Sequence, residues 1–404
     1  MAAVDAQFYW MSAKIPSDQF LLYAFAGVPA DLDGAVAEVL DRARANHDLT
    51  LRVADAAWGY PRWVASAEPT RAVIHRVADW AGCLDAVVRL ADAQLDVRVA
   101  PWRLHMFAPV HGIPGHRGAG TVAVLQVAHT LADGARASAL AAWLFGRSEP
   151  VAAVDGPGRG LLPWRALVAA RAHRIRARDT RAGRLPPPIG DRPALATNNR
   201  PEGARVVRTL VRHRAQLSGP TVTVAALSAV SAALSEYLDE PCDALGAEVP
   251  MAKAGVRLAN NHFGNIRVGL YPSLGREARF ERIGADVADG RLRAGHPASV
   301  AADRAFAATP AALLRWGVGK FDASIPPVRV AGNTVVSSVY RGAADLRFGT
   351  APVLLTAGFP ALSPAMGLTH GVHGIGDTVV VSVHAAESAI SEIEAYLRLL
   401  DAAL

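Results

Sequence analysis

Hydrophobic positions in the first 150 residues follow two different periods. Residues 20–26 and 121–128 are dense runs of apolar, β-favouring side chains, and residues 94–108 contain an alternating apolar segment. We expect a strand in each of these runs. Elsewhere apolar side chains recur at three- and four-residue intervals, over 32–46 and again over 135–146. That spacing gathers them on one face and predicts two helices.

The second half of the chain shows a similar alternation. A strand flanked by arginines is expected near Arg205, and the run 221–238 is strand-like at its start and helical later. A final amphipathic helix is predicted over 389–400. The uncharged stretch 348–376 is long enough to cross a bilayer, but prolines and glycines interrupt it, so we expect buried strands and loops there. Further strands are predicted at 247–251, 266–271, 334–339 and 378–384.

Between the halves lies a segment of different character. A Pro/Gly-rich stretch at 149–163 precedes a basic run, 164–185, in which seven arginines face one acid, Asp179. This predicts an inter-domain connection that carries a basic helix. Apolar residues on that helix, such as Trp164, could lie on a membrane surface, and a solvated or partly packed connector is an equally good interpretation.

The pattern therefore predicts an α/β protein with two layered halves side by side. We assign residues 1–150 to an N-terminal subdomain, 151–200 to a linker with the basic helix, and 201–404 to a C-terminal subdomain. The length of 404 residues fits two domains or one large double domain.

Composition narrows the class of protein. Half of the residues (51%) are hydrophobic, which excludes a disordered chain. Cys83 and Cys242 lie far apart, so neither a zinc site nor a disulfide framework is expected, and the N-terminus has no signal-peptide pattern. We therefore expect a cytoplasmic protein. The net charge of +6 favours acidic ligands or anionic membrane surfaces, but no basic stripe with interleaved aromatic residues indicates nucleic acid.

The candidate chemistry is concentrated in 125-LQVAHTLADGARAS-138. His129 follows a predicted strand, so its side chain would project beyond the strand end. Its ordinary pKa lets it take a proton from a hydroxyl or thiol at neutral pH. A hydrogen-bonded histidine in an interior turn is the competing interpretation. Asp133 stands directly before Gly134 and a helix, where it could be an N-cap as well as a charged partner.

Other motifs are weaker. His370 and His373 lie close together in sequence, but no cysteine or carboxylate accompanies them, so we expect no metal site and no bound cofactor.

Several stretches along nearly the whole chain resemble the bacterial wax ester synthase/diacylglycerol acyltransferases, within the superfamily of CoA-dependent acyltransferases that includes chloramphenicol acetyltransferase and condensation domains. His129, Asp133 and Gly134 match the second histidine, the aspartate and the glycine of the family's HHxxxDG signature. Five further stretches resemble family segments: 4-VDAQFYW-10, 42-RARANHDLTLRV-53, 94-QLDVRVAPWRLHMF-107, 259-ANNHFGNIRVGLYP-272 and the strand region 355–383.

The resemblance implies two chloramphenicol-acetyltransferase-like subdomains with a tunnel between them. It implies an O-acyltransferase that moves a fatty acyl group from acyl-CoA, a substrate and not a cofactor, to a long-chain alcohol or diacylglycerol. His129 would act as the general base, and Asp133 would form a structural ion pair with an arginine that the sequence does not identify. Asn261, Gly264 and Asn265 are candidate substrate-binding residues, the two asparagines as donors to the oxyanion. A peripheral position on a membrane or lipid droplet is also implied.

The chain departs from the family pattern at several points. Ala128 replaces the first histidine, Thr223 and Val224 replace an Asn-Asp pair, and 337-SSVYRG-342 replaces a proline-rich signature. Two other readings therefore remain open. One is an acyltransferase for a specialised complex-lipid or secondary-metabolite acceptor, and the other is a non-catalytic lipid-binding homologue.

Overall fold

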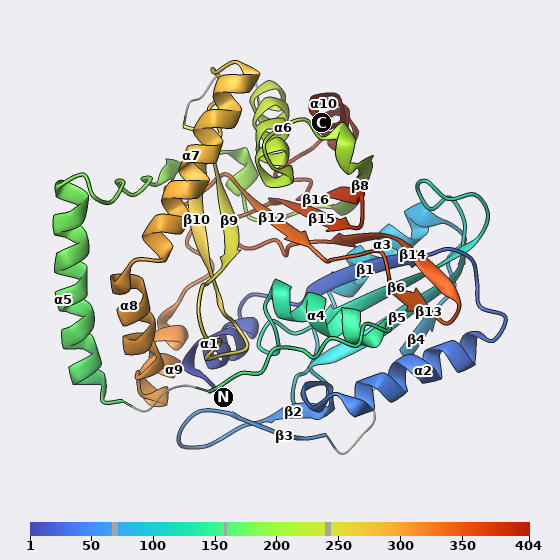
Figure 1. Ribbon diagram of the computed structural model, residues 1–404, viewed down its shortest axis with the longest axis horizontal. Helices are drawn as coiled ribbons and strands as arrows, with labels where there is room; N and C mark the ends of the chain where they lie inside the picture. Colours follow the sequence, from blue (N-terminus) through green and yellow to red (C-terminus); the bar gives the residue numbers. More distant parts are fainter. Residues whose placement is uncertain (67–71, 157–159, 239–243) are drawn as a thin grey trace.

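Two six-stranded sheets form the centre of the protein in the computed structural model, which describes residues 1–66, 72–156, 160–238 and 244–404. Figure 1 shows the first sheet with its helices on the right of the view and the second above and to its left. Helices cover the outer surfaces of both sheets. One buried cluster belongs to the second sheet and one mainly to the first, whereas a third joins residues of the first sheet to Val207 and Val380 of the second.

The first sheet has the order β13-β14-β1-β6-β5-β4, and its neighbours are antiparallel except for the parallel pair β4 and β5. Side chains alternate along β1: Tyr23 and Phe25 pack towards α2 and α4, whereas Leu22 and Ala24 pack towards α3. The elements are β1 (Gln19–Phe25), α2 (Leu32–Ala45), β4 (Ala72–His75), α3 (Trp80–Ala91), β5 (Trp102–Val110), β6 (Gly120–Val127), α4 (Gly134–Leu144), β13 (Arg347–Phe348) and β14 (Ala351–Gly358).

The second sheet has the order β10-β9-β12-β15-β16-β8. Helices α6, α7 and α10 cover its outer face, where Leu227, Leu234, Val381 and Tyr396 belong to one buried cluster. The elements are β8 (Arg205–His213), α6 (Val222–Tyr237), β9 (Gly246–Ala252), β10 (Phe263–Gly269), α7 (Arg276–Ala294), β12 (Thr334–Tyr340), β15 (Leu368–Ile375), β16 (Thr378–Ala386) and α10 (Ile393–Ala403).

Shorter elements and outer helices complete the molecule. Helix α5 (Leu162–Arg181) lies at the far left of Figure 1 and packs on α8 (Pro297–Ala307), whereas α9 (Ala311–Lys320) contacts α1 (Ala3–Ser12). No residue of α5 is buried. Two small two-stranded ribbons pair β2 (Leu51–Ala54) with β3 (Arg62–Ala65), and β7 (Arg192–Pro193) with β11 (Arg329–Val330).

Most predicted strands and helices are confirmed, and the differences have local causes. The run 221–238 is not strand-like at its start, because Thr221 accepts a hydrogen bond from the backbone of Val224 (3.2 Å) and caps a helix that begins at Val222. The last helix begins at Ile393 and not at 389. The uncharged stretch 348–376 contains the buried strands β14 and β15, and among the described residues no helix has the length and hydropathy to cross a bilayer.

The first sheet contains strands from both sides of the boundary predicted at residue 150. Strands β13 and β14 come from the second half of the sequence, yet β14 pairs along the edge of β1 in the first sheet, with Leu22 opposite Ala357. The two sheets also meet there, because Ser382 on β16 donates a hydrogen bond to the carbonyl of Gly358 on β14 (2.6 Å). The subdomain boundaries remain a prediction, since neither half of the sequence by itself supplies all strands of the first sheet.

Candidate active site

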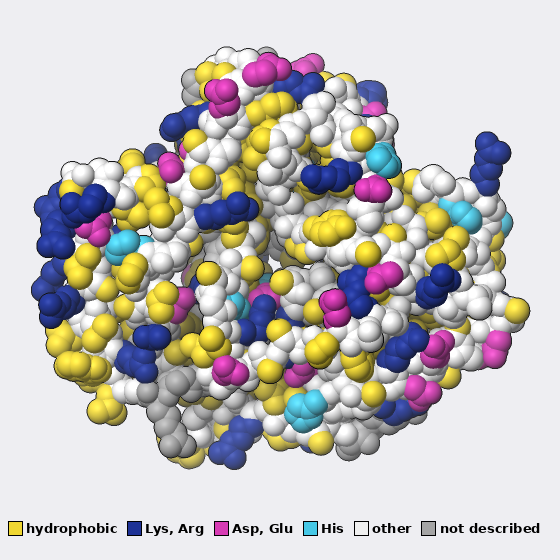
Figure 2. All heavy atoms as spheres, in the orientation of Figure 1, with side chains coloured by type: hydrophobic (Ala, Val, Ile, Leu, Met, Phe, Trp, Pro, Cys, Tyr) yellow, Lys and Arg dark blue, Asp and Glu magenta, His cyan; other side chains and the backbone are white. Residues whose placement is uncertain are grey.

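The turn between β6 and α4 carries His129. Every residue of β6 is buried, and Ala128 donates its backbone N–H to the carbonyl of Pro101 (2.9 Å), so the turn is fixed at the end of a central strand. The side chain of His129 is partly exposed and lines a cavity of about 860 Å³ whose walls come from both sheets. Figure 2 shows this face of the molecule hollowed near its centre, between the two halves.

Two contacts fix the His129 ring. The ring of Phe8 stacks on it, with centroids 4.1 Å apart and planes 3° from parallel, and Nδ1 lies 2.8 Å from Oδ1 of Asn261. The amide of Asn261 is itself oriented, because Nδ2 donates to Oδ1 of Asp5 (2.9 Å) and to the carbonyl of His129 (2.8 Å). Oδ1 of Asn261 can only accept, so Nδ1 of His129 carries the proton and Nε2 keeps its lone pair.

The electrostatic surroundings keep this histidine neutral. Burial lowers the pKa of His129, while hydrogen bonds to its own backbone and to Asn261, together with the charge of Asp133, oppose the shift only in part. An imidazole with a lowered pKa is unprotonated at neutral pH. His129 is therefore in the protonation state that a general base needs.

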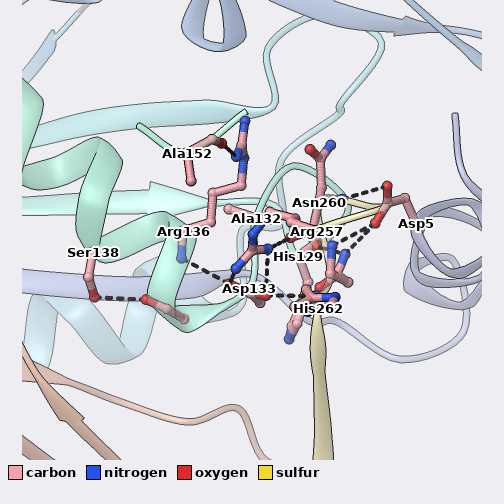
Figure 3. Close-up of polar contacts among 12 residues, drawn as sticks. Asp5, His129, Ala132, Asp133, Arg136, Ser138, Ala152, Arg257, Asn260 and His262 are labelled. Atoms are coloured by element: carbon pink, nitrogen blue, oxygen red, sulfur yellow. Dashed lines mark hydrogen bonds and ion pairs between the residues drawn. The ribbon is translucent and has the colours of Figure 1, made fainter. Parts of the chain in front are cut away.

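Asp133 has both of the roles that its position suggested. Its Oδ1 accepts the backbone N–H of Arg136 (2.9 Å) and caps α4, and its Oδ2 forms an ion pair with Nη1 of Arg257 (2.8 Å) and accepts the backbone N–H of His262 (2.8 Å). Figure 3 shows these contacts converging on one carboxylate. Asp133 thus fastens the turn of His129 to the segment that leads into β10.

The charge state of Asp133 follows from these contacts. Burial by itself would raise the pKa of its carboxyl group, but the hydrogen bonds from Arg257 and from the backbones of Arg136 and His262 outweigh that effect and lower the pKa. Asp133 is therefore ionised at neutral pH. A carboxylate that holds three donors is a structural anchor and has no proton to transfer.

A second buried carboxylate, Asp5 on α1, supports the same arrangement. Its two oxygens accept the backbone N–H groups of Asn260 (3.0 Å) and Asn261 (2.9 Å) as well as the amide of Asn261, as Figure 3 shows in part. Its backbone carbonyl accepts the hydroxyl of Thr130 (2.8 Å). Burial raises the pKa of Asp5 to about 6, despite the hydrogen bonds that favour the charged form. Helix α1 therefore holds both Asn261 and Phe8 against His129.

The predicted substrate-binding residues have different places. Asn265 lines the cavity, and its amide donates to Glu248 (2.9 Å). Gly134 also lines the cavity, whereas Gly264 and Asn261 are not among its lining residues. Both amide hydrogens of Asn261 are already donated within the protein, which leaves none for an oxyanion. Its position assigns it to orienting His129, and substrate contact by Asn265 and Gly264 remains a prediction.

Other residues of this site were not identified from the sequence. Arg257 is the partner of Asp133 that no local pattern identified, because the two residues are 124 positions apart. Asp5 and Phe8 lie in the quoted segment 4-VDAQFYW-10, which suggested their importance but not their contacts. Asp48, in the segment 42-RARANHDLTLRV-53, forms an ion pair with the buried Arg136 (2.5 Å).

The cavity wall is largely apolar, which suits a fatty chain more than a polar metabolite. Among the described residues, two histidines line the cavity, and of these only His129 has a stacked ring and an Nδ1 held by a hydrogen bond. No group of three or more histidine, cysteine or acidic side chains that could hold a metal ion occurs among the described residues. Apolar residues of the wall include Phe8, Met251, Phe263, Phe359 and Met366.

Comparisons by sequence give no relatives: no protein-family model and no curated protein matches this chain. Solved structures do match it over nearly its full length. The wax ester synthase/diacylglycerol acyltransferase from Marinobacter aquaeolei VT8 is 19% identical, with a TM-score of 0.62, and the match covers 99% of this chain and 96% of that one.

Two condensation domains are also similar. A variant of the starter condensation domain of rhizomide synthetase RzmA, in complex with C8-CoA and Leu-SNAC, is 15% identical with a TM-score of 0.59, and the match covers 99% of this chain and 92% of that one. The condensation domain of the Monacolin K polyketide synthase MokA is 13% identical with a TM-score of 0.56, covering 100% and 95%. The chain therefore has the two-sheet fold that wax ester synthase/diacylglycerol acyltransferases share with condensation domains.

Proposed function

We propose that this protein is an O-acyltransferase that moves a fatty acyl group from acyl-CoA to a hydroxyl group, with Nε2 of His129 as the general base. The observation that carries the proposal is the hydrogen bond between Nδ1 of His129 and Oδ1 of Asn261. It fixes the tautomer that leaves Nε2 basic, on a side chain that lines a large and mainly apolar cavity between the two sheets.

The reaction would proceed in one transfer step. Nε2 of His129 takes the proton of the acceptor hydroxyl while its oxygen attacks the thioester carbonyl. The carbon–sulfur bond then breaks, the ester forms, and the imidazolium returns the proton to the thiolate of CoA. Asp133 and Arg257 hold the turn in place, and Asn261 holds the ring, so none of the three needs to change protonation during the step.

The two substrates are proposed from the cavity and from the structural neighbours. A starter condensation domain of this fold is in complex with C8-CoA, which supports acyl-CoA as the donor. A long-chain alcohol or diacylglycerol is the leading acceptor, giving a wax ester or triacylglycerol, because a mainly apolar cavity accommodates such molecules.

A specialised acceptor is a second candidate, and one observation favours it. The segment 337-SSVYRG-342, which departs from the resembled family, contributes Ser337, Ser338, Tyr340 and Arg341 to the cavity wall. A change of side chains in the wall changes what the cavity can accept.

Release of the CoA thiol provides the test. The purified protein is incubated with acyl-CoA of several chain lengths and with a long-chain alcohol, diacylglycerol or an unrelated hydroxyl compound. Release that depends on the acceptor supports the proposal, and release with the unrelated acceptor alone favours the second candidate. Tight binding of fatty chains without release from any pair would make the protein a lipid-binding homologue instead.

A position on a lipid surface is proposed from α5. The helix exposes Trp164, Leu167 and Val168 at its beginning and several arginines along its length, and none of its residues is buried. Figure 2 shows basic and hydrophobic side chains gathered at the edge of the molecule where α5 lies. Such a surface would bind anionic lipid through its charges and insert its aromatic side chain at the interface.

A further inference from the structure

We propose that the cavity contains a binding site for a carboxylate group of the ligand, formed by Arg341 with His373 beside it. The proposal rests on the proposed acyl transfer and replaces its leading substrate pair: one of the two substrates carries a carboxylate in addition to its reacting group, which a plain fatty acyl chain, a long-chain alcohol and a diacylglycerol lack. Arg341 directly follows β12, His373 lies on β15, and both line the same cavity as His129.

The guanidinium of Arg341 is buried without an ionic partner. Only 6% of the residue is exposed, and no acidic side chain in the described ranges forms an ion pair with it. Arginine remains charged in proteins, and an unpaired buried charge is costly. The cost is recovered when a ligand brings the missing negative charge.

The hydrogen bonds of Arg341 leave part of the guanidinium free. Nη1 donates to the hydroxyl of Thr356 and to the carbonyl of Ala357 (3.2 Å), which holds the side chain against β14. Nε is buried and has no partner in the described part of the chain. An arginine presents its donors as a planar fork, so the side of the fork that β14 does not occupy can receive the two oxygens of a carboxylate.

Arg341 and His373 lie side by side against the end of β14. The carbon that a side chain at Gly358 would add lies 2.9 Å from Nη2 of Arg341 and 2.8 Å from Cε1 of His373, so only glycine lets both side chains pack this closely against the strand. Nδ1 of His373 is buried without a partner, as is the hydroxyl of Tyr23, whose ring lies 5.1 Å from the carbon of the guanidinium. Three unpartnered polar atoms therefore belong to adjacent side chains.

His373 can donate to an anion without a charge of its own. Burial and the neighbouring Arg341 lower its pKa well below the ordinary value, so the ring is neutral and carries one N–H. A carboxylate would thus meet one cation and neutral donors, which gives specificity for a single negative charge. A neutral alcohol or ester in the same place would leave the charge of Arg341 uncompensated.

The carboxylate could come from either substrate. It could stand at the far end of the acyl chain, as in an ω-carboxyacyl-CoA, or on the acceptor, as in a hydroxy acid. Both sources offer the same group to Arg341, so the structure identifies the chemistry and the experiment identifies the source.

Binding of matched probes tests the site without any turnover. Decanoate and decanol are titrated into the protein by calorimetry, and we expect decanoate to bind roughly ten- to hundredfold more tightly, in keeping with a charge-assisted hydrogen bond. Arg341→Met should abolish the difference in affinity between decanoate and decanol, and Arg341→Lys should retain part of that difference. The control variant Arg347→Met, at an exposed arginine, should retain all of it. Equal affinity for the two probes in the wild-type protein would overturn the proposal, whatever the stability of the variants.

Kinetics then identify the source of the carboxylate. Thiol release is first measured with decanol as the acceptor, and decanoyl-CoA is compared with its ω-carboxy analogue as the donor. It is then measured with decanoyl-CoA as the donor, and decanol is compared with 10-hydroxydecanoate as the acceptor. Arg341→Met should raise KM for the carboxylate member of one pair by a larger factor than KM for its neutral counterpart. An equal fall in kcat for every substrate assigns Arg341 to the reaction and refutes a recognition role. Carboxylate-selective binding without thiol release would leave the site intact and refute the acyl transfer alone.

Discussion

At the residue scale, the function of His129 depends on the position of a single proton. Asn261 accepts from Nδ1 because both of its amide hydrogens are committed to Asp5 and to the His129 carbonyl. Ala128 stands where the resembled family has its first histidine, and it is buried in a small apolar cluster. The absence of a histidine at this position is therefore compatible with a positioned base at His129.

His129→Ala should lower the rate of thiol release by roughly 10²- to 10⁴-fold, the usual contribution of a general base. The exposed His111 provides the control, and His111→Ala should retain the wild-type rate. Unchanged release in a folded His129→Ala protein would mean that another group removes the hydroxyl proton.

The pH dependence of kcat/KM should show an acid limb below pH 6.5. The base must be unprotonated, and burial lowers the pKa of His129, so activity rises with pH through that lowered pKa and is then constant. Burial raises the pKa of Asp5 to about 6, and Asp5 contacts Asn261, so it is the other group that could produce the limb. If the acid limb persists in the Asp5→Asn protein, protonation of His129 causes it. If the limb disappears, protonation of Asp5 causes it.

Asp133→Asn should destabilise the fold by roughly 3–5 kcal/mol, measured by denaturant unfolding, because asparagine can still cap α4 but leaves the poorly exposed Arg257 unpaired. The double variant with Arg257→Gln should recover part of the loss. Since the pKa of Asp133 is lowered in the folded state, its contribution is present above the unfolded value and is lost as the pH falls through the folded one. Additive effects of the two changes would refute the ion-pair role.

At the element scale, two helices build the site, whereas α5 packs mainly on another outer helix in the part of the chain that the structure describes. Helix α4 is capped by Asp133 and packs on β1, whereas α1 brings Asp5 and Phe8 to the histidine. Helix α5 has its contacts with α8 and buries none of its residues. Its exposed apolar and basic side chains are therefore available to a surface outside the protein.

If α5 lies on membranes, the protein should sediment with vesicles that contain phosphatidylglycerol and much less with phosphatidylcholine alone, and salt should weaken the binding. A triple change of Arg171, Arg174 and Arg178 to glutamine should abolish it. Three exposed arginines elsewhere, Arg62, Arg117 and Arg398, form the matched control set with the same charge change. Equal loss in both sets would indicate a general charge effect and no docking by α5.

At the scale of the whole molecule, the halves of the chain are not independent. Strand β14 completes the first sheet along β1, and its end at Gly358 is hydrogen-bonded to β16 of the second sheet. Asp133 from the first half is likewise paired with Arg257 from the second. The cavity lies where these contacts join the two sheets, so its shape depends on both halves at once.

Residues 1–150 produced alone should therefore fail to form a folded monomer, because without β14 the strand β1 becomes an unpaired edge in a sheet with an incomplete core. Coexpression with residues 151–404 should restore a soluble complex, measured by size-exclusion chromatography and circular dichroism. A cooperative, monomeric fold of 1–150 would show that the predicted boundary is sufficient.

Much of the secondary structure could be predicted because apolar spacing reports local geometry. The strand of 121–128, the helix of 32–46 and the basic helix after 164 all follow from it. The helices within 276–320 and at 3–12 were not predicted from apolar spacing, and the strand-like start of 221–238 was overridden by the cap at Thr221. His129, Asp133 and Gly134 could be identified by their motif, but Asn261 could not be given its role, because its partners are more than 130 residues away.

The sequence alone determined which elements form and which residues carry chemistry, because periodicity and motifs are local properties of the chain. It supplied a histidine at a strand end, an aspartate before a helix and an arginine in a segment that departs from the resembled family. Only the tertiary structure decided that Asn261 sets the tautomer of His129, that Arg257 pairs with Asp133, and that Arg341 is buried without a counter-charge. These outcomes depend on contacts between distant segments, and chain folding alone brings such segments together.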